Sequence, residues 1–196
     1  MQAAAGTKVP STKQKDFKQF VTMLQSATKA IPPVYMHLPV ASKEEPVYRE
    51  RVYCYELYHC LRKEMESVPH FNYLICGELA KDGHPLFRQN VLLNKAKPDF
   101  LVHIAGDTNN NLVAIEVKAV NAHSKAIRKD LNILTAFRRD SESGYPHAIY
   151  LIYGEGHKNL DRIKSTARST NGIDISTITL FWHRSANVQA EKQAWD

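Results

Sequence analysis

The feature that most constrains the fold of this chain is the segment 97–120, KPDFLVHIAGDTNNNLVAIEVKAV, which sets charged residues within apolar runs. Apolar residues recur at every second position over 99–104, as in a half-buried strand. A polar stretch, 106–111, then leads into a second apolar run, 112–120. Two such runs joined by turn residues predict a β-hairpin.

The charged residues of this hairpin are expected to lie together. Side chains on a strand point alternately to opposite faces, so Glu116 and Lys118 share one face, whereas Ile115, Val117 and Ala119 line the other. Asp99 precedes the first strand and reaches the same patch if the two strands pair in ordinary register. Carboxylates suit Mg²⁺, and a lysine beside them can orient or help to deprotonate a bound water. The alternative is a plain cross-strand salt bridge.

Composition describes a chain with one sizeable core and a basic surface. It has 196 residues, 43% hydrophobic, and a net charge of +6, which is compatible with a polyanionic partner such as nucleic acid. No apolar run approaches the roughly 18 residues of a membrane span, and the N-terminus lacks the apolar core of a secretory signal. We therefore expect a cytoplasmic protein without a membrane partner. Cys54, Cys60 and Cys76 lack metal-site spacing and are expected to be reduced thiols.

Periodicity and turn residues predict the other elements and a division of the chain. Helical spacing predicts helices over 12–30, 47–66, 122–139 and 158–167, and strand patterns occupy 71–79, 147–153 and 175–183. We expect a flexible N-terminus with an accessory helix over 1–40, one α/β domain over 41–185, and a tail with little core signal over 186–196.

One carboxylate of the second helix stands out from its surroundings. Positions about 100° apart on a helix put Glu50 near the middle of an apolar stripe, one turn before Tyr53 and Cys54. Glu56 is a competing candidate, although its helical neighbours are more polar. Either residue is an ordinary surface glutamate if no site lies beside it.

The residues Pro98-Asp99, followed by Glu116-Val117-Lys118 at the end of the next strand, resemble the signature of the PD-(D/E)XK, or restriction-endonuclease-like, nucleases. The predicted element order resembles the family core over most of the chain. The resemblance implies an α/β fold in which helices flank a mixed central sheet of about five strands, in αβββαβ order plus a further helix and strand, with an extra N-terminal helix. The nuclease-like domain would be 41–185.

The resemblance also implies a metal-dependent nuclease that hydrolyses phosphodiester bonds, with DNA as the expected substrate. Asp99 and Glu116, together with the Val117 carbonyl, would hold Mg²⁺, for which Mn²⁺ can substitute. Lys118 would orient the attacking water, and a helix-borne glutamate would support the metal. Glu50 matches that last placement better than Glu56.

The helix after the motif carries a candidate nucleic-acid surface in Lys125, Arg128 and Lys129. Helix N-termini and basic side chains both favour phosphate, although a solvated basic face is an equal alternative for each residue. Members of the resembling family carry a polar residue such as glutamine on this helix. The sequence shows none of that kind, and Arg128 or Lys129 would take its place.

Partners and biological role stay open at the level of sequence. Duplex cutting usually uses two active sites, so a homodimer is a reasonable expectation, and a targeting protein is an alternative because no extra recognition domain is evident. Two other readings remain. One is a non-catalytic nucleic-acid-binding or partner-docking module of the same fold, and the other is an unrelated α/β domain whose Glu116 and Lys118 form only a salt bridge.

Overall fold

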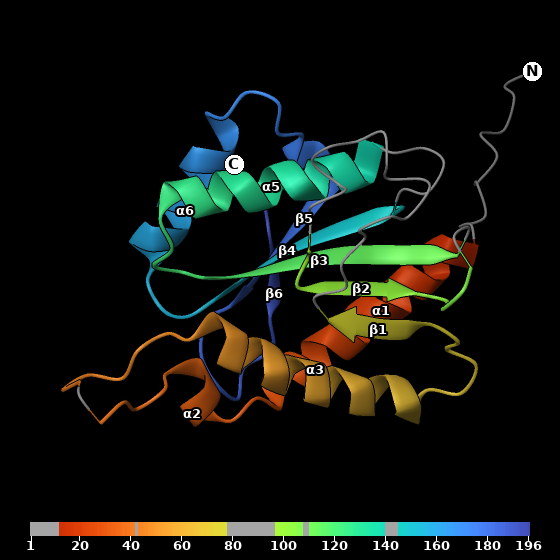
Figure 1. Ribbon diagram of the computed structural model, residues 1–196, viewed down its shortest axis with the longest axis horizontal. Coiled ribbons are helices and arrows are strands. Elements are labelled where there is room, and N and C mark those ends of the chain that lie inside the picture. Colours follow the sequence, from red (N-terminus) through yellow and green to blue (C-terminus); the bar gives the residue numbers. More distant parts are fainter. Residues whose placement is uncertain (1–11, 42, 78–96, 108–109, 140–144) are drawn as a thin grey trace, which may run out of the picture.

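The structure is a computed structural model that describes residues 12–41, 43–77, 97–107, 110–139 and 145–196. Within these residues the chain forms one open, six-stranded sheet with helices on both faces (Figure 1). The helices are α1 (Thr12–Lys29), α2 (Pro33–Met36), α3 (Glu50–Ser67), α5 (Ser124–Arg139), α6 (His157–Arg168) and a 3₁₀ turn at Ile175–Thr177. The strands are β1 (Leu74–Gly77), β2 (Phe100–His103), β3 (Asn111–Ala119), β4 (His147–Tyr153), β5 (Ile178–His183) and β6 (Glu191–Gln193).

The sheet is mixed, and its strands lie in the order in which the chain makes them. β1, β2 and β3 are antiparallel, β3, β4 and β5 are parallel, and β6 returns antiparallel to β5. β3 and β4 are central and buried on both faces, which explains their nearly continuous apolar sequence. The predictions of a mixed α/β sheet flanked by helices and of a β2–β3 hairpin are confirmed.

The C-terminal tail contributes a strand that its sequence does not predict. About five strands were expected, whereas the described residues form six, because β6 lies within the predicted tail, 186–196. Its sequence, EKQ, has no apolar alternation, and the strand is held at the sheet edge by backbone pairing to β5. Beyond it, Trp195 donates from Nε1 to the carbonyl of Ile178 at 2.8 Å, so the tail is packed onto the domain.

Each face of the sheet has its own apolar core. α1 and α3 cover one face, where Phe20 and Leu57 are fully buried, and α5 and α6 cover the other with Ile127 and Leu160. Figure 1 shows α3 below the sheet and α5 above it. α1, the predicted accessory helix, packs directly on α3 and fills part of the first core. None of the described helices has the length and apolar character needed to cross a bilayer.

The register of the hairpin leaves one edge of β3 without a strand beside it. The ladder between β2 and β3 ends at the pair Phe100–Ile115, whereas β4 continues along the other edge of β3 as far as Ala119. The last residues of β3 therefore extend past β2. Asp99, the residue just before β2, lies at this uncovered edge.

A tyrosine before α3 fixes the place at which that helix begins. The hydroxyl of Tyr48 accepts a hydrogen bond from the backbone N–H of Glu155 at 3.1 Å, and its ring packs edge-on against Tyr153 with 5.6 Å between centroids. Gly154, at φ +106°, lets the backbone pass close to the Tyr48 ring. These contacts tie the first turn of α3, and with it Glu50, to the ends of the parallel strands.

Replacement of Gly154 should loosen this connection. A Cβ at Gly154 would lie 2.5 Å from the Tyr48 ring and would sit on a strained backbone, so we expect Gly154→Ala to lower the free energy of unfolding by about 2–4 kcal/mol in urea titrations. Gly172→Ala is the matched control, because Gly172 also has a positive φ of +90° but no neighbour within 4 Å. Equal losses in the two variants would show that the Tyr48 contact does not matter.

Candidate functional site

Charged side chains from both faces of the sheet meet at the end of β3. The Nζ of Lys118 lies 2.9 Å from Glu50 Oε1, on the first residue of α3, and 3.0 Å from Asp130 Oδ2, on α5. Ile115, Val117 and Ala119 belong to the opposite core, so Glu116 and Lys118 do share a face, as the strand alternation predicts. Helices α3 and α5, from opposite faces of the sheet, thus converge on one ammonium group of β3.

Asp99 joins the group through the backbone of β3. Its Oδ2 accepts a hydrogen bond of 2.7 Å from the N–H of Val117, at the edge that β2 leaves uncovered. The N–H and C=O of one strand residue point to the same edge, so the Val117 carbonyl is directed to the side on which Asp99 lies. A carboxylate and a carbonyl are therefore presented from the same edge of β3.

The ammonium group of Lys118 is held by two carboxylates. Burial lowers the pKa of its amine, but the charges of Asp130 and Glu50 raise it further than burial lowers it, so the net shift of the pKa is upward. A primary ammonium has three N–H donors; Glu50 accepts a hydrogen bond from one of them, and Asp130 faces the group on a second side as an ion-pair partner. The remaining N–H can orient a water or a phosphate oxygen. Deprotonation of water by Lys118, one of the roles considered from sequence, does not suit a pKa raised in this way.

The site holds more carboxyl groups than its one lysine can balance. Burial raises the pKa of Glu116 well above its usual range, and the charges of Asp99 and Asp130 raise it further. Burial likewise raises the pKa of Asp99, against the Val117 hydrogen bond, and that of Asp130 to about 6, against the attraction of Lys118. These carboxyls therefore keep their protons to a higher pH than usual, and the site lacks a second cation that would hold all of them ionised.

A hard divalent cation fits this deficit better than a soft one. Among the described residues, no three or more His, Cys, Asp or Glu side chains are grouped so as to hold a metal by themselves. Mg²⁺ commonly takes only one or two protein carboxylates and fills its other positions with waters and substrate oxygens. Asp99, Glu116 and the Val117 carbonyl can supply such an all-oxygen set, and they offer no thiolate or imidazole for zinc.

Asp130 is a member of the group that sequence reasoning missed. It lies three residues after Ile127 and four before Leu134, so it falls on the apolar stripe of α5, and only 5% of its surface is exposed. A carboxylate within an apolar stripe was the same signal that singled out Glu50. Two exposed basic residues, Arg128 and Lys129, directly precede it in the sequence.

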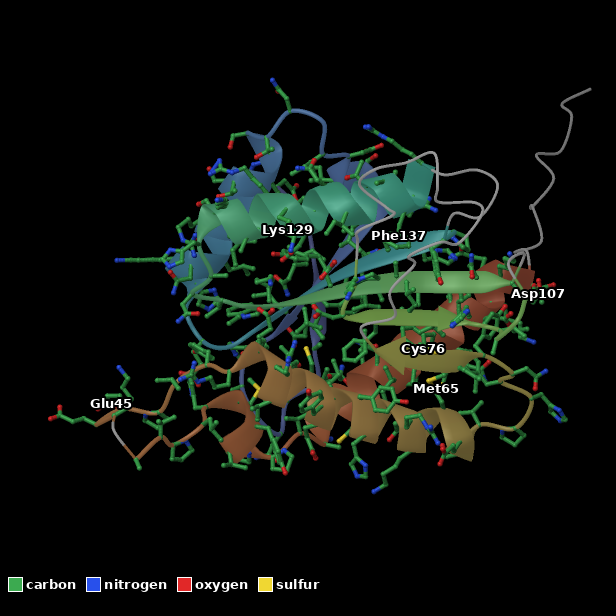
Figure 2. All side chains as sticks on the ribbon, in the orientation of Figure 1. Glu45, Met65, Cys76, Asp107, Lys129 and Phe137 are labelled. Atoms are coloured by element: carbon green, nitrogen blue, oxygen red, sulfur yellow. The ribbon has the colours of Figure 1, made fainter. Side chains whose placement is uncertain are left out.

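The predicted basic residues of α5 occupy the other side of the helix. Lys125, Arg128 and Lys129 are exposed, and Lys129 is labelled on α5 in Figure 2. Arg128 and Lys129 therefore do not take the polar position that faces Lys118, which belongs to Asp130. The three basic side chains remain available to solvent as a surface next to the site.

The structure also separates the two candidate glutamates of α3. Glu50 contacts Lys118, whereas Glu56 lies beside Cys60, whose Sγ is 3.7 Å from Glu56 Oε1. Helical periodicity explains the difference, because residues six positions apart on a helix lie on different sides of it. All three cysteines are free thiols, as expected.

A cleft of about 500 Å³ opens beside two of these carboxylates, Glu50 and Asp99. One wall comes from α3 and the other from the neighbouring ends of β1 and β2. A small ligand in this cleft would reach the acidic group directly.

Comparison with known proteins adds no identification, since no family model, curated protein or solved structure matches the chain. Its function has to be argued from the geometry of the site.

Metal binding should be visible as thermal stabilisation. A cation held by Asp99 and Glu116 binds only the folded state, so Ca²⁺ or Mg²⁺ at about 100 times its dissociation constant should raise the melting temperature by roughly 5–10 °C. Asp99→Asn should remove most of this shift. Asp107→Asn is the matched control, because Asp107 lies in the turn that joins β2 to β3, at the opposite end of β2 from Asp99. Figure 2 shows Asp107 well away from Lys129, which lies next to the site on α5. An unchanged shift in Asp99→Asn would contradict the ligand assignment.

The stability conferred by Asp130 should depend on pH. Its pKa is about 6 in the folded protein against an ordinary 3.8, so between these values the folded state binds more protons than the unfolded state, and the contribution of Asp130 to stability falls as the pH rises. The Asp130→Asn variant lacks this loss. Its free energy of unfolding relative to wild type should therefore increase by about 1–3 kcal/mol between about pH 4 and pH 7.5, measured by urea unfolding.

Asp161→Asn, at an exposed position on α6, provides the control for this measurement. A relative stability of Asp130→Asn that stays constant or falls across the same pH range would contradict the buried, repelled state of the Asp130 carboxylate.

Proposed function

We propose that this protein is a metal-dependent nuclease of the restriction-endonuclease-like kind, which hydrolyses phosphodiester bonds of nucleic acid, with DNA as the first substrate to test. The observation that carries the proposal is the meeting of Asp99, Glu116 and Lys118 at the uncovered end of β3, where the carboxyl groups outnumber the lysine. The element order from α3 to β4, with β2 and β3 as a hairpin, supports it.

The acidic residues and the lysine would have different catalytic roles. Asp99, Glu116 and the Val117 carbonyl would hold Mg²⁺ or Mn²⁺, which supplies polarisation of the phosphodiester and stabilisation of its developing negative charge. Lys118 would direct its remaining N–H to the attacking water. Glu50 and Asp130 would hold the Lys118 ammonium in place. Overall, water is added across one P–O bond, giving a terminal phosphate and a free hydroxyl.

The exposed basic residues of α5 support a polyanionic substrate. Lys125, Arg128 and Lys129 lie in the first half of the helix that also carries Asp130, so they flank the site on its solvent side. Phosphate contacts of this kind position a nucleic acid without reading its sequence. Duplex cleavage would call for two copies of the site, in a homodimer or with a targeting partner, and light scattering on the purified protein distinguishes monomer from dimer.

A second candidate function is a non-catalytic nucleic-acid-binding or partner-docking module. The observation that favours it is that Lys118 is already paired with two carboxylates, in a group of described residues with no complete set of metal ligands. Such a module would bind nucleic acid or protein without cleavage and without the metal-dependent rise in melting temperature.

Cleavage assays distinguish these functions. We expect Mg²⁺- and Mn²⁺-dependent cleavage of at least one DNA in a panel of linear, circular, branched and single-stranded molecules. Asp99→Asn and Lys118→Ala should each lower the rate by about 100-fold or more, because each removes a group that acts on the reacting atoms. Asp107→Asn and Lys63→Ala, at positions away from the site, are the matched controls.

Folding of each variant is checked by circular dichroism. Full activity in Asp99→Asn or Lys118→Ala would overturn the assigned roles. A wild-type protein that cleaves nothing and is not stabilised by metal would favour the non-catalytic module.

A further inference from the structure

The cleft beside the acidic group has an aromatic and cationic wall that the proposed chemistry does not use. α3 contributes Arg51, Tyr55 and Tyr58 to it, and Gly77, Asp99 and Phe100 lie opposite. Glu50 and Asp99 line the same cleft, so a ligand resting on this wall also touches the candidate site.

Tyr55 is the least expected member of this wall. Its side chain is 64% exposed, which makes it one of three large hydrophobic residues that are exposed in the described part of the chain. Single exposed hydrophobic residues are common and need no explanation by themselves. Tyr55 differs by its position, because it stands in a concave surface next to carboxylates rather than on an open helix face.

Residues one turn on either side of Tyr55 extend this wall along α3. Tyr58 lies one turn after Tyr55 and stacks on Phe100, with ring centroids 6.3 Å apart and planes 21° from parallel. Arg51 lies one turn before Tyr55 and is exposed. A flat ring, a supported aromatic pair and a guanidinium group thus follow one another along one side of α3.

This combination suits a nucleobase with its phosphate. Bases stack on aromatic side chains irrespective of sequence, and arginine adds a contact to phosphate or to the base plane. A volume of about 500 Å³ is of the size that holds one small-molecule ligand. A base within a duplex has both faces covered by its neighbours, so only an unpaired nucleotide can offer a face to Tyr55.

We propose that the cleft binds an unpaired nucleotide next to the scissile phosphate, with its base stacked on Tyr55, so that the protein acts on single-stranded segments, flaps or overhangs in preference to fully paired duplex. The position of the phosphate rests on the proposed nuclease function, whereas the position of the base rests on the cleft. Arg51, on the same wall as Tyr55, would contact the phosphate of this nucleotide or the plane of its base.

The binding experiment uses a single-stranded oligonucleotide that contains 2-aminopurine, whose fluorescence falls when the base stacks on an aromatic ring. With Ca²⁺ in place of Mg²⁺, wild type should quench this fluorescence, and Tyr55→Ala should bind about tenfold more weakly and lose the quenching. Tyr55→Phe keeps the ring and should keep both. Leu74→Ala is the control for removing an exposed apolar side chain outside the cleft, since Leu74 is 52% exposed on β1.

The cleavage experiment compares a forked or overhanging DNA with a blunt duplex of the same sequence, in Mg²⁺. Wild type should prefer the unpaired substrate by about tenfold or more in kcat/KM; Tyr55→Ala should lose most of that preference, whereas Leu74→Ala should keep it. Unfolding midpoints within error of wild type confirm that the variants are folded.

The outcomes separate this inference from the nuclease proposal. Cleavage of blunt and unpaired DNA at equal rates, or unchanged binding and quenching in Tyr55→Ala, overturns the inference and leaves the nuclease standing. Quenching that depends on Tyr55 without any cleavage supports the base site and overturns the nuclease. Binding of neither DNA by wild type overturns the inference and favours a protein partner at this surface.

Discussion

The structure depends on one lysine that joins both faces of its sheet. Lys118 lies near the end of β3, where its ammonium reaches Glu50 on α3 and Asp130 on α5, and these two helices cover opposite faces. Apolar packing alone would leave each helix free to shift along its own core. Two ion pairs to one partly buried cation instead set the start of α3 and the middle of α5 relative to each other and to β3.

The same arrangement leaves the fold with unbalanced charge. Glu50, Asp99, Glu116 and Asp130 gather around Lys118, and burial and mutual repulsion raise the pKa of the last three of these carboxyls. Removal of carboxylates from water is costly unless a cation or hydrogen bonds compensate. Groups with such raised pKa values commonly mark a functional site, and we propose that a divalent cation supplies the compensating positive charge and in turn binds the phosphodiester.

The cleft adds a second, chemically different surface to this acidic centre. The carboxyl groups of Glu50 and Asp99 and the exposed ring of Tyr55 all line it, on α3 and beside the start of β2. α3 therefore has two roles, since its first residue, Glu50, holds the lysine and its next turns form the aromatic wall. The contacts of Tyr48 with Glu155 and Gly154 attach the start of this helix to the ends of the parallel strands.

The sequence by itself determined the elements, the mixed α/β class and the shared face of Glu116 and Lys118, because periods of 2 and 3.6 residues depend only on local backbone geometry. It also marked Glu50 as a carboxylate within an apolar stripe. It did not single out Asp130, although the same pattern was present, and it did not show β6, whose EKQ sequence pairs through its backbone alone. Only the tertiary structure decided that Glu50 and not Glu56 meets Lys118, that Asp99 bonds to Val117, and that Tyr55 borders the acidic group. Those contacts join residues many positions apart, and their distances follow from how helices pack on a sheet, which no local pattern records.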